Sequence, residues 1–415
     1  MENTPLIKKV ARCRVCKEND FTKVLTFGPT PLANAFLSKD KIDREEYFYP
    51  LDVYFCNNCK FLTLGHVVSP VALFKDYVYV SSTSQVFINH FKTFSKEIYK
   101  RFKLTEKSLV LDIGSNDGIL LRPFKDLGTK VLGIEPASKI AFLAQKEGVE
   151  TISEFFSVQL AKKIVGKYGH AKIATATNVF AHIDDLDEVI KGLDILLDKD
   201  GIFIMEAPYL VDFLEKRYFD LVYHEHLSYW SIKSLITLFK RFDMEVFDVQ
   251  KVAVHGGTIR VFIARKRVHK KEKSVAKFLS LEKKWKLEQK ETYLQFSDKV
   301  LENKIKLLAL LRKIKSENKK IVGYGASAKG NTLLNYFSIG QEFLDYIVDD
   351  SSWKQGLYSP GKRISVVSSK VLANDKVDYI LILAWNFAQS IMANNKKFSE
   401  KGGHFIIPVP RPIII

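Results

Sequence analysis

The sequence predicts an α/β protein with a zinc-binding N-terminal unit, a central doubly wound parallel sheet and a C-terminal α/β unit. Two C-x-x-C pairs hold all four cysteines and precede the first strand expected in the central sheet. Apolar runs such as LVLDIG, KVLGIEP, KIATATNVF and GIFIMEAP then alternate with apolar helical segments, a pattern typical of a parallel sheet. A strand, glycine turn and helix recur in IVGYGASAKGNTLLNYF. We expect the three parts to span residues 1–72, 73–265 and 266–415.

Composition limits the class of protein without identifying it. The chain has 415 residues, 47% of them hydrophobic, and a net charge of +17, which suits a soluble protein of two or three domains. The excess charge fits either a lysine-rich solvated surface or an anionic ligand, which is nucleic acid or a phosphorylated small molecule. The N-terminus MENTPLIKKV lacks an apolar signal core, and no run is long enough for a bilayer. We therefore expect a cytoplasmic protein without a membrane partner.

The cysteine pairs predict one structural zinc ion. Cys13, Cys16, Cys56 and Cys59 can place four thiolates on a tetrahedral ion, and four protein ligands leave no open position for catalysis. A disulfide framework is the first alternative, but nothing marks the chain as secreted. Redox activity is the second, but two paired motifs with no other cysteine argue against it. Removing the ion should unfold this small unit.

The segment VLDIGSNDG (110–118) predicts a cofactor site in the central sheet. It indicates a buried strand, a turn between Gly114 and Gly118 that includes Asn116, and a helix start. The next strand ends in Glu135, so Asp112, the turn and Glu135 should share the carboxyl edge of the sheet. A strand-end carboxylate there suits ribose hydroxyls. The turn lacks G-x-G-x-x-G and resembles the first motif of S-adenosylmethionine-dependent methyltransferases; the alternative is an ordinary βα junction.

Further candidates follow the later strands. Phe155 comes after a short strand near residues 150–152, where an aromatic ring can flank a purine or simply pack in the core. Asn178 and His182 follow the fourth strand at the same edge, although a lone histidine is more often structural. The N/D-P-P-aromatic run typical of amino-methylating enzymes is missing there, which argues against methylation of exocyclic amines on bases.

The densest chemistry lies in YFDLVYHEHLSYW (218–230). Tyr223, His224, Glu225, His226 and Tyr229 crowd this stretch. The H-E-H spacing is wrong for zinc ligands on a helix, which need i and i+4. A general base, an orienting acid and a phenol donor could all come from here; the alternative is a polar loop over the sheet edge.

Two shorter stretches carry candidates for substrate contacts. Tyr77 and Tyr79 lie in the segment that joins the zinc unit to the central sheet, where their hydroxyls either reach a cleft or lie on the surface. His255 and Gly256 begin HGGT, whose glycines allow a ligand close to the backbone or form a plain hairpin turn.

The C-terminal unit follows a charged helical connector at residues 266–320. The turn Gly323 to Ala328 fits G-x-G-x-x-A, and its amides at a helix N-terminus should bind phosphate with Lys329 near. By this pattern alone, the turn is also compatible with NAD. The next strand, in FLDYIVDD, ends in acids, including Asp349.

Taken in order, these pieces resemble one family, the three-domain sugar C-methyltransferases that act on nucleotide-linked keto sugars. The matching pieces are the two C-x-x-C pairs, SSTS, VLDIGSNDG, NVFAHI, YHEHLSYW, HGGTIRVF, GYGASAKGNTLLNY and VDDSSWKQGLYSPG. They cover essentially the whole chain. One departure is Ser352-Trp353, where a proline-containing turn is expected.

The resemblance implies a Rossmann-like methyltransferase domain in the centre and a Rossmann-like C-terminal domain that binds a nucleotide diphosphate sugar rather than NAD. It implies a transferase that methylates the carbon beside the ketone of a keto-deoxysugar through an enolate. His226 would be the base, oriented by Glu225, while Tyr223 or Tyr77 and His182 would donate hydrogen bonds to the oxyanion or hold the sugar. Tyr79 is the alternative to Tyr77. We expect a monomer or weak dimer.

The remaining expected contacts divide between the two ligands. Those for S-adenosylmethionine are Asp112, Gly114, Asn116, Gly118, Glu135, Phe155 and Asn178. Those for the substrate are Tyr79, His224, His255, Gly256, Tyr324, Ser327, Lys329, Asn331 and Asp349.

Three rival interpretations stay open at this point. A zinc-ribbon nucleic-acid methyltransferase suits the net charge, but carbon-5 pyrimidine methylation typically needs a cysteine nucleophile and every cysteine is assigned to zinc. A nicotinamide-dependent sugar-modifying enzyme would use the Gly323 to Ala328 turn. A scaffold that has lost catalysis is the third, and the intact Tyr223 to His226 cluster speaks against it. We therefore expect no nucleic-acid partner.

Overall fold

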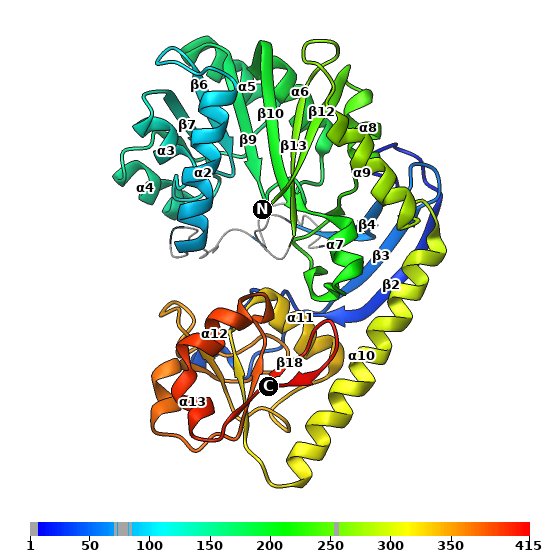
Figure 1. Cartoon of the computed structure of the whole chain (residues 1–415), viewed down its shortest axis with the longest axis vertical. Coiled ribbons are helices and arrows are strands. Elements are labelled where there is room, and N and C mark those ends of the chain that lie inside the picture. Colours follow the sequence, from blue (N-terminus) through cyan, green and yellow to red (C-terminus); the bar gives the residue numbers. More distant parts are fainter. Residues whose placement is uncertain (1–6, 70–72, 74–81, 83–84, 253–256) are drawn as a thin grey trace.

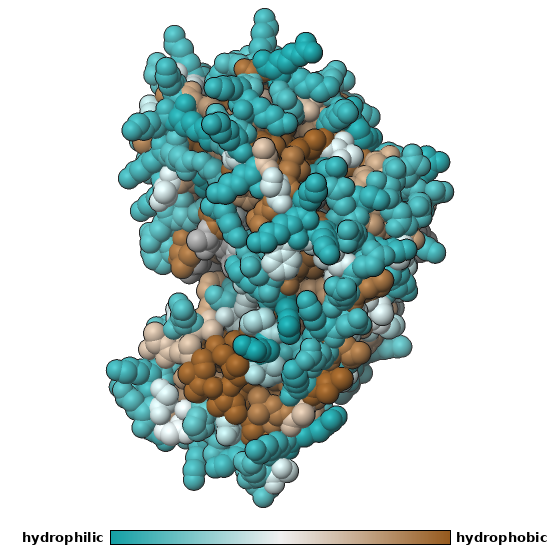
Figure 2. All heavy atoms as spheres, turned by 45° about the vertical axis from the view of Figure 1, so that its right-hand side comes forward, coloured by the Kyte–Doolittle hydropathy of each residue, from teal (hydrophilic) through white to brown (hydrophobic). Residues whose placement is uncertain are grey.

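The computed structural model describes residues 7–69, 73, 82, 85–252 and 257–415. Its strands form three main sheets, and β1 (Ile7–Lys9) pairs separately with β5 (His66–Val68). The two α/β units lie one above the other, and the N-terminal strands lie beside them on one side (Figure 1). A recess opens between the upper and lower units on the opposite side of the molecule (Figure 2). No helix in these ranges combines the length and apolar character needed to cross a membrane.

The N-terminal sheet is antiparallel and takes one strand from a distant part of the chain. Its order is β11-β4-β3-β2. The strands are β2 (Phe21–Thr30), β3 (Tyr49–Cys56), β4 (Leu62–Leu64) and β11 (Ser228–Tyr229). β11 belongs to the segment YHEHLSYW and pairs with β4 through Ser228 and Thr63. The stretch with the candidate catalytic groups therefore ends as an edge strand of the cysteine-bearing sheet.

The central sheet has seven strands in the order β12-β13-β10-β9-β6-β7-β8. These are β6 (Leu109–Ile113), β7 (Lys130–Ile134), β8 (Thr151–Ile152), β9 (Ala171–Thr177), β10 (Leu197–Pro208), β12 (Met244–Val252) and β13 (Thr258–Arg265). All residues of β6 are buried, as expected for a parallel strand covered on both faces. The predicted α/β sheet is confirmed, with one difference: β13 runs antiparallel to both of its neighbours, β10 and β12. β12 and β13 follow one another in the chain without the crossover that parallel neighbours need.

Helices cover both faces of this sheet, as a doubly wound fold requires. They are α2 (Gln85–Arg101), α3 (Leu121–Asp126), α4 (Ser138–Lys146), α5 (Val158–Tyr168), α6 (Leu186–Leu196) and α8 (Ile232–Lys240), while α7 (Leu210–Glu215) lies beyond the end of the sheet (Figure 1). Amphipathic α2 buries Phe87, Phe91, Phe94 and Ile98, one stripe at helical spacing. β9 and β10 point toward the lower unit (Figure 1), so their carboxyl ends face it.

The C-terminal unit follows two connecting helices, α9 (Lys273–Lys284) and α10 (Lys290–Ser316). Its sheet has the order β16-β15-β14-β17-β18-β19. The strands are β14 (Ile321–Tyr324), β15 (Ile347–Asp349), β16 (Val366–Ser368), β17 (Tyr379–Ile382), β18 (His404–Ile407) and β19 (Ile413–Ile414), and the helices are α11 (Ala328–Phe337), α12 (Ala388–Asn394) and α13 (Lys396–Glu400). The recurring strand, turn and helix predicted at residues 321–337 is therefore present.

Short 3-10 helices complete the described structure. They are η1 (Lys39–Lys41), η3 (Phe219–Leu221), η4 (Ser369–Ala373) and η5 (Trp385–Phe387). η3 packs against α11 of the lower unit through Phe219, whose ring lies 4.9 Å from that of Phe337. This contact ties the YFDL stretch of the central unit to the C-terminal unit.

Candidate active site

The four cysteines converge on a site that fits a zinc ion. Their sulfur atoms all lie within 4.8 Å of one another, with 3.6 Å between Cys13 and Cys59 and 3.5 Å between Cys16 and Cys56. Zn–S bonds of about 2.3 Å in a tetrahedron put sulfurs about 3.8 Å apart. Both pairs share one turn geometry: the amides of Lys17 and Lys60 each donate to the first cysteine carbonyl at 2.9 Å. All four positions come from protein, so the ion is structural.

The glycine turn after β6 is built for close backbone approach. Gly114 has φ +69°, and a Cβ there would lie 2.4 Å from Cγ2 of Val179. Gly118 and Asn116 also have positive φ. Oε2 of Glu135 accepts from the Asn116 amide at 3.0 Å, and Oε1 accepts from Ala137 at 2.9 Å. The turn and the end of β7 therefore meet at one edge, as predicted.

Asp112 lies at the same edge and is almost fully buried. The Thr175 hydroxyl donates to its Oδ1 at 2.6 Å, but burial dominates and raises the pKa of Asp112 to about 7. Burial also raises the pKa of Glu135. Two buried carboxyls with raised pKa values suit hydroxyl partners such as a ribose, because a hydroxyl can donate to the ionised form and accept from the protonated form.

The other predicted cofactor contacts stay predictions, and the structure gives their positions. The side chain of Phe155 is 56% exposed just after β8, so its ring is available to a ligand. Asn178 has φ +59°, and its amide donates to the Glu206 carbonyl at 2.8 Å. This bond turns the chain sharply after β9 and starts the loop that carries His182.

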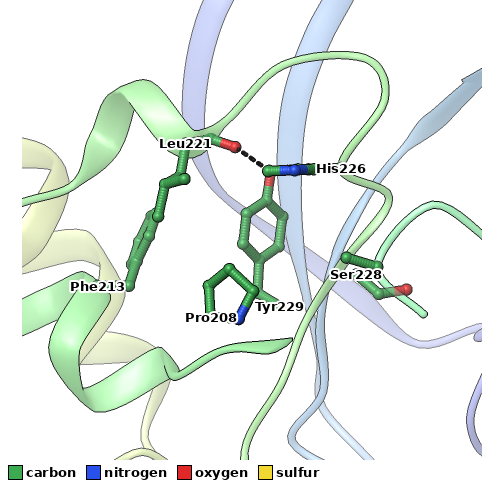
Figure 3. A pocket seen from close by; sticks show the side chains of 7 residues that line it. Pro208, Phe213, Leu221, His226, Ser228 and Tyr229 are labelled. Carbon is green, nitrogen blue, oxygen red and sulfur yellow. Dashed lines mark hydrogen bonds between the residues drawn. The ribbon is translucent and has the colours of Figure 1, made fainter. Parts of the chain in front are cut away.

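His226 is held by two hydrogen bonds that define its tautomer. Nδ1 lies 2.8 Å from the Leu221 carbonyl, which can only accept, so Nδ1 carries the proton (Figure 3). Nε2 lies 2.8 Å from the Tyr223 hydroxyl, from which it accepts when the imidazole is neutral. His226, Leu221 and Tyr229 line a cavity of about 10 Å³, about the room of one water molecule. A neutral imidazole with a basic Nε2 is what a general base requires.

His182 lies against this pair. Its ring centre is 4.9 Å from that of His226, edge to face. Burial lowers the pKa of His182 to about 4, against the opposing effect of backbone hydrogen bonds to Asn178 and Glu225. It therefore stays neutral at pH 7, and a neutral neighbour does not oppose the charge that His226 gains when it takes a proton.

Two predicted roles in this stretch do not match the geometry. We predicted that Glu225 orients His226, but the Leu221 carbonyl occupies Nδ1, and Oε1 of Glu225 instead accepts from Asn34 of the N-terminal unit at 2.6 Å. Burial raises the pKa of Glu225 to about 7. The cause is the local fold: residues 223–225 turn rather than extend, so adjacent side chains diverge.

His224 was expected to bind substrate, and the structure assigns its side chain another position. It is 2% exposed, and its Nε2 lies 3.2 Å from the Tyr49 carbonyl on β3. Burial lowers its pKa to about 4. His224 thus joins the central unit to the cysteine-bearing sheet and has no exposed face for a sugar.

In the C-terminal unit, Lys329 is the predicted substrate residue best placed for an anion. Its Nζ is buried 5.1 Å above the Trp385 ring and has no hydrogen-bond partner among the described residues. Burial lowers the pKa of Lys329, and the carboxylate of Asp220 opposes that shift. Asp220 accepts from the Trp385 indole, and burial raises its pKa to about 6. This cluster lies where η3 of the central unit meets the start of α11.

Asn331 was also expected at the substrate, and its amide nitrogen already bonds to the N-terminal unit. That side chain is 1% exposed, and Nδ2 donates to the Ala33 carbonyl at 2.7 Å. The reason is a docking contact that joins α11 to the loop after β2, two segments far apart in the sequence.

The remaining predicted substrate residues shape the glycine turn. Ser327 caps α11 by accepting from Gly330 at 3.1 Å, and Asp349 accepts from Ala326 at 2.7 Å. The Tyr324 hydroxyl donates to Asp350 at 3.0 Å.

Trp353, at the departure from the family pattern, is 66% exposed. Tyr77, Tyr79, His255 and Gly256 lie outside the described residues, so their predicted roles are untested.

Several residues of the site were not predicted. Asn34, Asp220, Trp385 and the Leu221 carbonyl all contact predicted groups. Trp385 follows the carboxyl end of β17 and begins η5, and the rule that ligands gather at strand ends points to it. Asn34 gave no such indication, because its partner Glu225 is distant in the sequence.

Comparison with known proteins matches the chain in three consecutive parts. Family models match a zinc binding domain at residues 13–74, a methyltransferase domain at 88–249 and a C-methyltransferase C-terminal domain at 253–410. The chain is 38% identical over 411 residues to the C-methyltransferase NovU of Streptomyces niveus, covering 99% of this chain and 98% of that protein.

Solved structures match less than half of the chain, at low identity. A SAM-dependent methyltransferase of Anabaena variabilis has 15% identity and a TM-score of 0.34, covering 46% of this chain and 97% of that one. The magnesium protoporphyrin IX methyltransferase of Synechocystis, bound to SAH, has 14% identity and a TM-score of 0.35, covering 47% and 92%. Because the relative from Streptomyces niveus matches at 38% identity over almost the full length, and three domain models follow in the expected order, the chain belongs to the three-domain C-methyltransferases, enzymes that use S-adenosylmethionine and carry a structural zinc.

Proposed function

We propose that this C-methyltransferase methylates the carbon beside the ketone of a nucleotide diphosphate-linked keto-deoxysugar, by way of an enolate. The observation that carries the proposal is the placement of His226, whose Nε2 lies 2.8 Å from the Tyr223 hydroxyl and whose Nδ1 lies 2.8 Å from the Leu221 carbonyl. Such a histidine can take a proton from carbon, which a C-methyltransferase needs because a C–H carbon is nucleophilic only after that proton leaves.

In the proposed reaction, His226 removes the α-proton of the sugar. Nε2 takes the proton from the α-carbon, the C–H electron pair forms the enolate C=C bond, and the carbonyl π pair moves to oxygen. The resulting imidazolium keeps its Nδ1 bond to the Leu221 carbonyl, which stabilises the new charge. The Tyr223 hydroxyl, 2.8 Å from Nε2, must first turn its proton toward the ketone oxygen, which frees the Nε2 lone pair for the α-proton and places a donor at the oxygen that becomes the enolate oxygen.

His182 acts as a neutral neighbour in this scheme. Because its pKa is about 4, it can donate to the enolate oxygen without competing for the charge of His226. When bound, S-adenosylmethionine supplies the methyl group that the enolate carbon takes, and it leaves as S-adenosylhomocysteine. Asp112, Glu135 and the Gly114 to Gly118 turn would hold it, and Phe155 and Asn178 would flank it.

The nucleotide diphosphate part is proposed to bind in residues 266–415, at the start of α11. The buried Lys329 ammonium beside this helix N-terminus supports an anion there. Net charge +17 agrees with an anionic substrate. A nucleic-acid substrate is disfavoured, because all four cysteines meet in the metal cluster and leave no thiol for attack on a pyrimidine.

A screen of keto-sugar nucleotides with methyl-labelled S-adenosylmethionine tests the proposal. We expect label on a carbon next to the ketone of at least one sugar, located by mass spectrometry and NMR. Label on a hydroxyl or amine, or transfer to RNA but to no sugar nucleotide, would contradict it.

A further inference from the structure

A buried arginine lies between two of the zinc ligands. The guanidinium of Arg14, in Cys13-Arg14-Val15-Cys16, is 3% exposed. Its Nε donates to Oδ1 of Asp184 at 2.9 Å. Its Nη1 donates to the Thr63 hydroxyl and, at 3.2 Å, to the Leu64 carbonyl. One side chain therefore joins the cysteine turn to β4 and to the loop after β9.

Two of these partners, Asp184 and Thr63, are connected to the segments that carry the proposed catalytic histidines. Asp184 stands two residues after His182, in the same loop. Thr63 donates to the carbonyl of Leu227, the residue after His226, at 2.9 Å. The two segments also touch directly, since the Ser228 amide donates to the Ala181 carbonyl at 3.2 Å.

We infer that Arg14 is a positioning residue, which sets the separation of His182 and His226. The inference rests on the proposed function, in which these two imidazoles act on one substrate. Arg14 has the geometry for this task, because a planar guanidinium can hold two partners in fixed directions at once. Its own backbone is fixed by the cysteines on either side, which bind the zinc.

A second arginine contacts the same turn. Its variant distinguishes the positioning of the two histidines from simple docking of the cysteine turn on the central unit. Arg241 donates from Nη1 to the Val15 carbonyl at 2.9 Å and pairs with both oxygens of Asp187 at 3.0 and 2.7 Å. These bonds fasten the turn to α6, and none of them reaches the segment of His182 or that of His226. If docking alone mattered, losing Arg241 would impair catalysis as much as losing Arg14.

Lys8 supplies a matched control for the carboxylate. Its side chain is 68% exposed and pairs with Asp184 Oδ2 at 3.2 Å. Lys8→Met removes a charge from the same carboxylate but leaves the Arg14 link, and exposed pairs of this kind contribute little. Asp184→Asn weakens the link at a residue that is 30% exposed, so it should fold even where an Arg14 variant does not.

The test compares Arg14→Lys and Asp184→Asn with Lys8→Met and Arg241→Lys in the zinc-loaded full chain. We expect the first two to lower kcat on the sugar found by the screen by about 10- to 100-fold. The KM for S-adenosylmethionine should stay within about twofold, and zinc content should not change. The kcat of the double variant should be little lower than that of either single variant, because the two substitutions weaken the same link.

Histidine NMR tests the inference without any substrate. With nitrogen-15-labelled histidine, the His182 and His226 signals should shift in Arg14→Lys and Asp184→Asn but stay near wild type in both controls. Unshifted signals with wild-type kcat, an equal kcat loss in Arg241→Lys, or zinc loss that explains the defect would each overturn it. If no keto-sugar is methylated by the wild type, the proposed function fails, and the NMR comparison still decides the role of Arg14.

Discussion

Replacing Gly114 by alanine tests whether the Gly114 to Gly118 turn and the loop that carries His182 depend on one contact. The new Cβ would lie 2.4 Å from Cγ2 and 3.3 Å from Cγ1 of Val179, on a backbone with φ +69°. The left-handed backbone costs about 1–2 kcal/mol for a residue with a Cβ, and overpacking costs about 1–3 kcal/mol more. We therefore expect unfolding free energy to fall by about 2–5 kcal/mol.

Cofactor affinity and kcat should fall together with stability, since the clash displaces both the Gly114 to Gly118 turn and the loop that carries His182. The Val179 carbonyl accepts from the His182 amide at 2.9 Å, so a displaced Val179 also displaces His182. We expect the affinity for S-adenosylhomocysteine to fall more than tenfold by calorimetry, together with kcat. Urea denaturation gives the unfolding free energy.

Two variants separate strain from clash. Gly128 has φ +91°, and a Cβ added there would meet nothing within 4 Å, so Gly128→Ala should show only the backbone cost. Val179→Ala combined with Gly114→Ala should regain the overpacking part. If Gly114→Ala is no more destabilising than Gly128→Ala, the close packing of the two loops is not what the turn requires.

Three further predictions concern the zinc, the buried Glu225 and Lys329. Chelating the zinc should lower Tm and abolish turnover together, because β11 is a strand of the zinc-bearing sheet; retained turnover by the metal-free chain would contradict this. The folded pKa of Glu225 is raised to about 7 from 4.5, so the folded state binds the extra proton and this contribution to stability is present at low pH and lost as pH rises from about 4.5 to 7. Glu225→Gln should flatten that slope in urea titrations and stabilise the protein at pH 8 by on the order of 1–3 kcal/mol, whereas an unchanged slope would refute the assignment. Lys329→Met should raise KM for the sugar nucleotide more than tenfold with kcat within about threefold, while an unchanged KM would place the diphosphate elsewhere.

Much of the central unit could be predicted because its determinants are local. The apolar run before Gly114 and the acid after Lys130 to Ile134 specify a strand, a turn and a strand end within a few residues, and the structure has each of them. The cysteine pairs were equally readable, since ligand type and spacing define a tetrahedral site without knowledge of the fold.

The contacts of the HEH stretch were not predictable in the same way. Glu225 meets Asn34, and His224 meets Tyr49, and both partners belong to a unit far away in the sequence. The strand pairing of β11 with β4 brings them together, and no periodicity in YHEHLSYW indicates which distant edge it joins. The bond between Asn331 and the Ala33 carbonyl was not predictable for the same reason, because tertiary docking alone brings the two residues together.

Deuterium exchange at the α-carbon tests the role of His226 most directly, since it isolates proton removal from methyl transfer. With the sugar found by the screen, S-adenosylhomocysteine and D₂O, we expect the wild type to incorporate deuterium beside the ketone without methylation. His226→Asn should lose this exchange by at least about 100-fold, in the range of general-base catalysis, and Tyr223→Phe should keep part of it. Exchange at a near wild-type rate in His226→Asn would show that another group removes the proton.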